Sequence, residues 1–450
     1  MEWSQIEIKL QQLLESGRHS ELRGALMVLS PVDIAQFLEA LDPEKTLLVF
    51  RILPKDISAD VFSYMSSEKK QALIESIGDN EIRNLINDMF LDDTVDFLEE
   101  LPANVVKRVL QNTDTKTRNL INQFLQYQDN SAGSIMTIEY MELRADITVK
   151  QALAEIKQVG FDKETIYTIY IIDEGRRLIG TVALKKLILC DENALIQSIM
   201  DTSVISVTTA DDQEKVASLV RRYDLLAIPV VDKESRLVGI ITADDIMDVI
   251  QEENTEDFEK MAALTPSEDS YLHTSPWKLA INRIPWLLLL SIAAIFTGMI
   301  ITQFEGLLQN VDIVLTACIP MLMDTGGNCG AQVSTLIIRG LALNELQPKD
   351  ILKILWKEFR VALIVGAVLS VFTFLRVYFL NQAGYLVSLT VAAALYCTVI
   401  VAKAIGCCLP LLAKKIHLDP ALMASPLITT IVDATSLTIY FSIATALLMS

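Results

Sequence analysis

A row of polar side chains runs through an apolar stretch near the C-terminus. Positions 425, 429, 433, 436 and 440 are Ser, Thr, Asp, Ser and Tyr. Because residues three or four apart share one face of a helix, these side chains form a single polar stripe with a carboxylate at its middle. A charge at the centre of a membrane costs about 2.5 kcal/mol or more, so it marks an ion path or a buried ion pair. Asp433 is therefore a candidate cation ligand, and the alternative is a structural pair with Lys403.

A second candidate segment is rich in glycine. Residues 320–332 read PMLMDTGGNCGAQ, with three glycines, Asn328 and Gln332 in the middle of an apolar run. These residues weaken a helix and would expose backbone carbonyl groups. Within the hydrocarbon layer of a membrane, exposed carbonyl groups occur only where protein buries them or where they line a water-filled cavity. Gly326 and Gly330 also have the spacing that allows two helices to pack closely. The two interpretations are compatible.

The elements that position these residues are long apolar segments. A spanning helix needs about 20 mostly apolar residues. Five segments qualify or nearly so, namely 286–302, 313–338, 361–380, 386–413 and 422–449. Five buried helices of a large soluble protein are the alternative, but such closely spaced apolar runs are typical of a membrane domain.

The basic residues predict the orientation of these spans. The second connection carries Arg339, Lys349, Lys353, Lys357 and Arg360, and the fourth carries Lys414 and Lys415. The connections at 305–312 and 381–385 carry neither Lys nor Arg. Because cytoplasmic loops are enriched in Lys and Arg, we expect the N-terminal part to lie in the cytoplasm and the C-terminus outside an inner (plasma) membrane.

The charge of the 450-residue chain is concentrated before these spans. From Arg283 onward there are about 10 Lys and Arg against about 8 Asp and Glu, so about 28 and 49 of the 38 and 57 precede it. A net charge of about −21 in that part argues against nucleic-acid binding, which needs a basic face. The six cysteines and three histidines show no metal-binding or disulfide spacing. The composition excludes a simple soluble enzyme, and we expect no enzymatic activity.

The acidic part contains two kinds of element. Residues 1–130 have apolar positions at helical spacing, as in Ile34, Phe37, Leu38 and Leu41, with prolines near predicted helix starts. Residues 134–250 contain a repeat, because SIM recurs at 134 and 198 and YIIDEGRRLIG (170–180) recurs as PVVDKESRLVG (229–239). Each copy predicts a strand, a helix, a β-hairpin and a helix, and the pair resembles tandem CBS domains.

The predicted architecture is therefore multidomain. It has an all-α superhelical N-terminal domain, α/β tandem CBS domains, a long connecting helix and an all-α membrane domain with five transmembrane helices. The boundaries are 1–130 for the acidic helical domain, 131–197 and 198–250 for the CBS repeats, 251–275 for the acidic connecting helix and 276–450 for the membrane domain.

The glycine-rich PxxxxxGGNxGxQ stretch and the DPAL…PLxTTxxD stretch together resemble the MgtE family of magnesium channels and transporters. The resemblance covers essentially the whole chain. It implies a homodimer in membrane lipid, with a Mg²⁺ pore on the two-fold axis lined by the second and fifth helices. The implied ion ligands are Asp433, Asn328 and the carbonyl of Thr429, and the implied pore-lining residues are Gly326, Gly327, Ser425, Pro426 and Ser436. The chain has Ser425 where the family often has Asn and Ser436 where glycine is expected, and Asp324 is an additional acid.

Two features of Mg²⁺ agree with these residues. Mg²⁺ binds oxygen and gives up its waters reluctantly, so a pore for it should be wide and should offer a carboxylate with neutral oxygens. Soft divalent metals would favour thiolate or imidazole ligands. We therefore expect Mg²⁺ as the transported cation, and the sequence leaves the selectivity over other divalent cations open.

The resemblance also implies that cytosolic Mg²⁺ binds the acidic part and closes the pore. A divalent cation between facing carboxylates would offset the self-repulsion of this part and stabilise its compact form. The corresponding acids are Asp92, Asp96, Glu214, Asp224, Asp245, Glu253, Glu256 and Asp257, with Asp419 at the cytoplasmic mouth.

Members of the family that the chain resembles can hold ATP between the CBS copies, and the sequence leaves open whether this chain does. Tyr167 or Tyr170 could stack on adenine, and Asp248 could bind the ribose hydroxyls. The first copy has Leu184, Lys185 and Lys186 where nucleotide-binding relatives have an Arg-Asp pair, so the match is incomplete. Two other functions stay open, a sodium-coupled magnesium exchanger and a non-conducting membrane-anchored sensor of ions or nucleotides.

Overall fold

A computed structural model gives the fold. It describes residues 3–99, 101–267, 271, 274–304, 313–343, 345–423 and 425–448. The chain divides into two compact units, Met1–Ile250 and Gln251–Ser450. Each unit is described on its own below.

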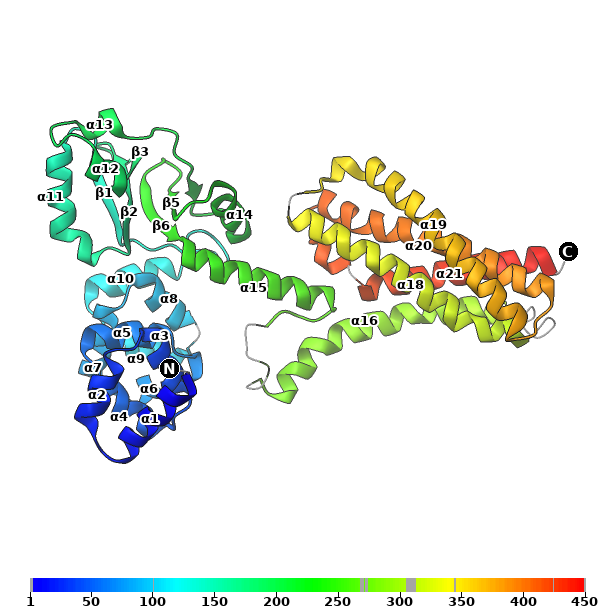
Figure 1. The fold of residues 1–450 in the computed structure, drawn as a ribbon, viewed down its shortest axis with the longest axis horizontal. Coiled ribbons are helices and arrows are strands. Elements are labelled where there is room, and N and C mark those ends of the chain that lie inside the picture. The colour runs from blue at the N-terminus through cyan, green and yellow to red at the C-terminus, as the bar shows by residue number, and fades with distance from the viewer. Residues whose placement is uncertain are drawn as a thin grey trace. The chain divides into compact units, whose positions relative to one another are not determined.

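The first unit begins with short helices that cluster together, coloured blue to cyan in Figure 1. They are α1 (Trp3–Glu15), α2 (His19–Leu26), α3 (Pro31–Glu39), α4 (Pro43–Ile52), α5 (Lys55–Ser63), α6 (Ser67–Ser76), α7 (Asp79–Asp88), α8 (Leu91–Glu99), α9 (Ala103–Asn112) and α10 (Thr115–Phe124). The predicted helix starts are confirmed at α3 and α4, where a proline follows the capping side chains of Ser30 and Asp42. These caps accept the N–H groups of Asp33 and Lys45, which the first turn leaves without a helical partner. Ile34, Phe37 and Leu38, predicted on one face, are all buried.

Two three-stranded sheets follow, one from each copy of the repeat. The first copy contributes β1 (Tyr140–Arg144), α11 (Val149–Val159), η1 (Gly160–Asp162), β2 (Thr165–Ile172), β3 (Leu178–Ala183), α12 (Leu184–Leu189) and α13 (Ile196–Ile199). The second contributes β4 (Val207–Thr208), α14 (Gln213–Tyr223), β5 (Ala227–Val231), β6 (Leu237–Thr242) and α15 (Ala243–Met261). In both sheets a parallel pair is followed by an antiparallel hairpin, so the predicted order of elements is confirmed.

The two copies are joined through the segments that the sequence repeats. Thr137, just after the first SIM, exchanges backbone hydrogen bonds with Ile240 in β6. Asp201, just after the second SIM, exchanges them with Thr181 in β3. A side chain at Gly239 would lie 2.7 Å from the sulfur of Met136, so glycine is required for this approach. The repeat therefore encodes the contact between the copies.

The acidic connecting segment is shorter as a helix than predicted. We expected a helix over 251–275, but α15 runs without interruption from Ala243 and ends at Met261. Ala263 adopts a left-handed backbone conformation with φ of 55°, and the N–H of Leu264 bonds to the carbonyl of Glu259. This left-handed termination stops the helix before Pro266.

The second unit contains the long helices. They are α16 (Pro276–Gln303), α18 (Ile313–Ala342), η2 (Pro348–Asp350), α19 (Ile351–Phe379), α20 (Tyr385–Lys415), η3 (Pro420–Met423) and α21 (Ser425–Leu448). In Figure 1 the helices α18 to α21 run alongside one another, and α18, α20 and α21 pack pairwise. Large apolar side chains on α16 and α19, among them Leu287, Ile292 and Phe372, are more than 60% exposed. Such a surface favours lipid over water.

Four of the five predicted spans are confirmed as helices long and apolar enough to cross a membrane. Among the described residues they lie at Pro276–Gln303, Pro348–Phe379, Tyr385–Lys415 and Pro420–Leu448. The helix α18 has 30 residues, but its central glycines, Asp324 and Asn328 make it too polar to join them by composition. The predicted connection at 305–312 lies outside the described residues.

Candidate functional site

The glycine-rich segment is a regular part of α18. The helix continues through Gly326, Gly327 and Gly330, so the predicted weakening of the helix with exposed carbonyl groups is wrong. A side chain at Gly330 would lie 2.8 Å from Ile428 of α21 and 3.3 Å from the carbonyl oxygen of Ala402 in α20. The glycines are therefore needed for close helix packing, which was the other interpretation of their spacing.

The same helix carries a polar face that no other element of the described chain covers. Asp324, Asn328 and Gln332 follow one another at four-residue intervals, and all three are exposed. The opposite face, with Leu322, Gly326 and Cys329 among others, is buried. The chain thus exposes polar side chains from the middle of a long, mostly apolar helix.

The stripe predicted on α21 is divided between two environments. Thr429 and Asp433 are half-buried, whereas Ser436 and Tyr440 are 1% and 0% exposed. The hydroxyl of Tyr440 donates to the carbonyl of Leu315 in α18 at 2.8 Å. Ser436 lies against Gly326 of α18, and Thr429 packs on Gly327 of the same helix. Pro426 is half-buried at the start of α21, and the side chain of Ser425 lies outside the described residues.

The buried lysine of α20 has a partner other than the candidate ligand. The amine of Lys403 lies 3.4 Å from a carboxylate oxygen of Glu358 in α19. The alternative in which Lys403 neutralises Asp433 is therefore wrong. The electrostatic neighbour of the Asp433 carboxylate is Asp324 on α18, which is also an acid.

A charged group lies where α21 begins. The amine of Lys260 in α15 is 2.7 Å from Oδ2 of Asp419 and 2.7 Å from Oε1 of Glu256. The other oxygen of Asp419 accepts the N–H of Ala421 and thereby holds η3. Burial and the charge of Asp419 raise the pKa of Asp257 to about 6, and despite burial the two carboxylate partners raise the pKa of Lys260. Three predicted metal ligands therefore gather around an ammonium group.

An acidic cluster lies in the first unit and consists of Asp92 and Asp93 in α8, Asp244 and Asp245 at the start of α15, and Glu164 just before β2. Burial, followed by the charges of Asp93 and Asp245, holds the pKa of Asp92 well above its ordinary value. Oδ1 of Asp92 is buried without a hydrogen-bond partner. Burial and the neighbouring acids also raise the pKa of Glu164 to about 7 and that of Asp245 to about 6. The cluster therefore gathers acids whose negative charges disfavour one another.

The other predicted ligands are not brought into this cluster. Asp96, Glu214 and Asp224 are exposed, and Asp224 ends α14 in a left-handed conformation with φ of 51°. Glu253 is half-buried in α15. Within the described ranges, no three His, Cys, Asp or Glu side chains are arranged to hold a metal ion. These assignments stay predictions.

The predicted nucleotide ligands differ in accessibility. Tyr170 is fully buried with its ring edge-on to Tyr140, so it offers no face to a ligand from solution. Tyr167 is 67% exposed, and Asp248 is exposed on α15. Of the two tyrosines, Tyr167 is the one available for stacking.

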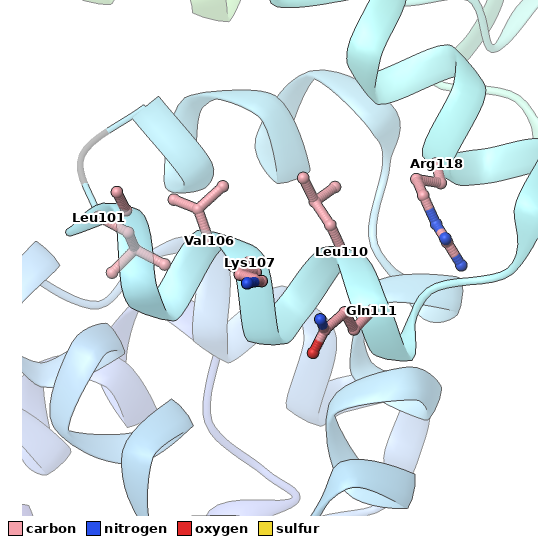
Figure 2. A pocket seen from close by; sticks show the side chains of 7 residues that line it. Leu101, Val106, Lys107, Leu110, Gln111 and Arg118 are labelled. Atoms are coloured by element: carbon pink, nitrogen blue, oxygen red, sulfur yellow. The ribbon is translucent and has the colours of Figure 1, made fainter.

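Two hollows of the first unit contain none of the predicted site residues. One of about 460 Å³ is lined by Leu101, Ala103, Val106, Lys107, Leu110, Gln111 and Arg118, mostly from α9 (Figure 2). The other, of about 430 Å³, lies between α10 and the hairpins of the sheets, where it is lined by Tyr127, Tyr140, Arg176, Asp232 and Arg236 among others. Arg176 in the second hollow is bonded to Glu142 and to the hydroxyl of Tyr140.

Four residues of these sites were missed by sequence reasoning. Asp93 and Asp244 are direct neighbours of the predicted Asp92 and Asp245, and helical spacing alone did not connect them to the cluster. Glu164 has no motif, and only the fold brings it to α8. Lys260 follows Glu256 by four residues, a spacing typical of a helical ion pair that could have indicated it.

Comparisons with known proteins add independent findings. Family models described as a divalent cation transporter, an MgtE intracellular N domain and a CBS domain match residues 319–443, 29–130 and 196–252. The magnesium transporter MgtE of Thermus thermophilus is 36% identical over 98% of both chains. That of Bacillus subtilis is 33% identical over 100% of this chain and 99% of its own.

Solved structures agree with these relatives. The soluble part of a magnesium transporter has a TM-score of 0.54 and 32% identity, covering 56% of this chain and 99% of its own. The cytosolic domain of the Mg²⁺ channel MgtE, in complex with ATP, has a TM-score of 0.52 and 35% identity, covering 54% of this chain and 99% of its own.

Proposed function

The chain belongs to the MgtE family of magnesium transporters, and on this premise we propose that it is a homodimeric Mg²⁺ channel that cytosolic Mg²⁺ closes. The single observation that carries the proposal is the uncovered polar face of α18 beside the Asp433 carboxylate. Polar side chains at membrane depth face protein or water and not lipid. A second copy of the subunit would cover this face and enclose a polar path.

The proposed ion site uses Asp433 from each subunit. Two carboxylates supply a formal charge of −2, which matches the charge of one Mg²⁺ ion. Asn328 and the carbonyl of Thr429 are the proposed neutral oxygen ligands, which agrees with the preference of Mg²⁺ for oxygen. Gly326, Gly327, Pro426, Ser425 and Ser436 are proposed to shape the path around them. A magnesium ion that keeps its waters would contact these groups with little dehydration.

Closure is proposed to depend on the acidic cluster and on the acids of the connecting helix. The cluster suits Mg²⁺ because all its ligands are carboxylates and one buried oxygen of Asp92 has no partner. Asp92 and Asp245 would hold Mg²⁺ there, with Glu164 as an addition, and Asp96, exposed on the same helix as Asp92, would contribute from outside the cluster. Glu214, Asp224, Glu253, Glu256, Asp257 and Asp419 complete the proposed set. Removing repulsion among these acids would favour the closed form by mass action.

ATP is proposed as a second regulatory ligand of the sheets. The solved cytosolic domain of the related channel is in complex with ATP, and it is 35% identical to this chain. Tyr167 would stack on adenine, Asp248 would bind the ribose, and Lys185 and Lys186 would face the phosphates. In the proposed orientation the first unit lies in the cytoplasm and the C-terminus outside the plasma membrane, and no enzymatic step is involved.

Magnesium influx into proteoliposomes, followed with an internal magnesium dye, tests this proposal. We expect influx without a sodium gradient, and we expect Asp433→Asn to reduce it by more than about tenfold because the charge facing the ion is lost. Thr438→Val on the same helix is the matched control, since Thr438 is exposed and donates only within α21. Influx that requires sodium would favour the exchanger, and no influx under any gradient would favour the sensor.

A further inference from the structure

A lysine occupies the position between the connecting helix and the start of the pore helix. Lys260, in the last turn of α15, is 2.7 Å from Asp419 and is 159 residues away from it in sequence. Its side chain is only 20% exposed, and that of Asp419 is 32% exposed. The contact is therefore partly shielded from water, unlike the ion pairs on the surface of the first unit.

Asp419 links Lys260 to the part of the second unit where η3 meets α18 and α21. Its second oxygen accepts the N–H of Ala421 at 2.8 Å and so fixes η3. The carbonyl of Met423, the last residue of η3, accepts the hydroxyl of Ser334 in α18 at 3.0 Å. Two residues later α21 begins. Lys260 is thus connected through η3 to α18 by hydrogen bonds, and to α21 by the backbone that follows η3.

The charges around Lys260 explain why a cation is needed there. Glu256, Asp257 and Asp419 gather on one side of α15, and their mutual repulsion would push the helix end away from η3. A hydrogen bond between charged partners is stronger than one between neutral partners, whereas three facing carboxylates without a cation would be unfavourable. The ammonium group therefore stands where a divalent cation would otherwise be required.

We propose that Lys260 is a positioning residue that holds the connecting helix on η3 in the absence of Mg²⁺. The inference rests on the proposed function, because it deepens how the connecting helix controls the pore. In this proposal two different cations, the Lys260 ammonium and Mg²⁺, act on the acids around the start of the pore helix. The tethered ammonium of Lys260 maintains the contact at the mouth while Mg²⁺ is absent, and Mg²⁺ that binds these acids and the acidic cluster closes the pore.

Hydrogen–deuterium exchange on the full-length protein in nanodiscs tests this inference without any measurement of flux. In Mg²⁺-free buffer we expect Lys260→Met to speed amide exchange in residues 251–262 and 420–428 by about tenfold relative to the wild type. Lys260→Arg should stay within about twofold of the wild type, because the cation is retained. The matched control is Lys353→Met, since Lys353 forms an exposed pair with Asp350.

Two further measurements complete the test. Adding millimolar Mg²⁺ should restore protection in Lys260→Met, because the divalent cation then binds the three free carboxylates. Asp419→Asn should give the same loss, and the double variant should add nothing to it. Unchanged exchange in Lys260→Met without Mg²⁺ would overturn the inference, as would equal losses in Lys260→Met and Lys260→Arg. A failure of the proposed channel would appear separately, as absent influx by the wild type.

Discussion

The amine of Lys403 in α20 lies 3.4 Å from a carboxylate oxygen of Glu358 in α19, and the two side chains are 7% and 16% exposed. This pair joins the two helices at a depth where neither charge is well hydrated. It also leaves Asp433 without the lysine that could have neutralised it. The buried lysine of α20 therefore does not compete for the Asp433 carboxylate.

Breaking this pair on one side should destabilise the protein. Glu358→Gln leaves the ammonium of Lys403 buried without a counter-charge, which costs roughly 3–5 kcal/mol. The expected result is a clearly lower unfolding temperature in detergent, measured by the fluorescence of the tryptophans. Replacing both residues, as Glu358→Gln with Lys403→Met, should recover most of the loss. A double variant as unstable as the single one would show that the pair does not act through its charge.

The close approach of α18 and α20 predicts a strict requirement for glycine. A side chain at Gly406 would collide with the backbone carbonyl of Gly330. Gly406→Val should therefore separate the two helices and destabilise the membrane unit by roughly 1–3 kcal/mol. Gly298→Ala is the control, because a side chain there meets nothing within 4 Å. The measurement is the yield of monodisperse protein on size exclusion, and equal yields for both variants would contradict the packing argument.

The acidic cluster predicts how stability depends on pH. The pKa values of Asp245 and Glu164, raised by burial to about 6 and about 7, lie above the ordinary values of 3.8 and 4.5. Groups with raised pKa values bind protons more tightly when folded, so they stabilise the fold at low pH and this contribution is lost as the pH rises toward 7. Without Mg²⁺, the first unit should therefore unfold at a lower temperature at pH 7.5 than at pH 5.5.

Magnesium and a matched variant check that this dependence comes from the cluster. Adding Mg²⁺ at pH 7.5 should remove much of the difference, because the cation replaces the protons between the carboxylates. Asp245→Asn with Glu164→Gln should flatten the pH profile, whereas Glu155→Gln on the exposed face of α11 should leave it unchanged. A profile that keeps its slope in the double variant would place the titrating groups elsewhere.

The acids of the connecting helix should set the sensitivity of closure. Neutralising Glu253, Glu256 and Asp257 together should leave the ion path intact while removing ligands for cytosolic Mg²⁺. We expect the internal Mg²⁺ concentration that halves influx to rise by about tenfold, which corresponds to about 1.4 kcal/mol of coupling. The measurement is influx into proteoliposomes loaded with graded Mg²⁺ concentrations.

An equal number of exposed acids serves as the control for that experiment. Glu155, Asp162 and Glu192 are exposed side chains of the first unit, and none of them belongs to α15. Their joint neutralisation changes the net charge of the chain by the same amount. Closure of the connecting-helix variant at the wild-type concentration would show that these acids do not regulate the pore.

Much of the architecture could be predicted from the sequence because it follows from local periodicity. The repeat at 134 and 198 predicted two copies of one motif, and the copies form matching sheets. Pro31 and Pro43 predicted helix starts, and both helices begin there. Length and composition predicted the apolar helices, since a span depends on the residues of one segment alone. The exception is α18, because the polar residues in its middle lower the mean hydropathy by which a span is identified.

Which side chains contact one another across different helices was decided only by the tertiary structure. Helical spacing placed Asp433 and Ser436 on one face, but packing against Gly326 buries the serine and leaves the aspartate half-exposed. Lys403 pairs with Glu358, and Lys260 with Asp419, across separations of 45 and 159 residues. The physical reason is that periodicity fixes the direction of a side chain from its own helix, whereas an ion pair or a close glycine contact depends on the distance to another element. That distance is set by how whole helices pack, and no single segment of the sequence contains it.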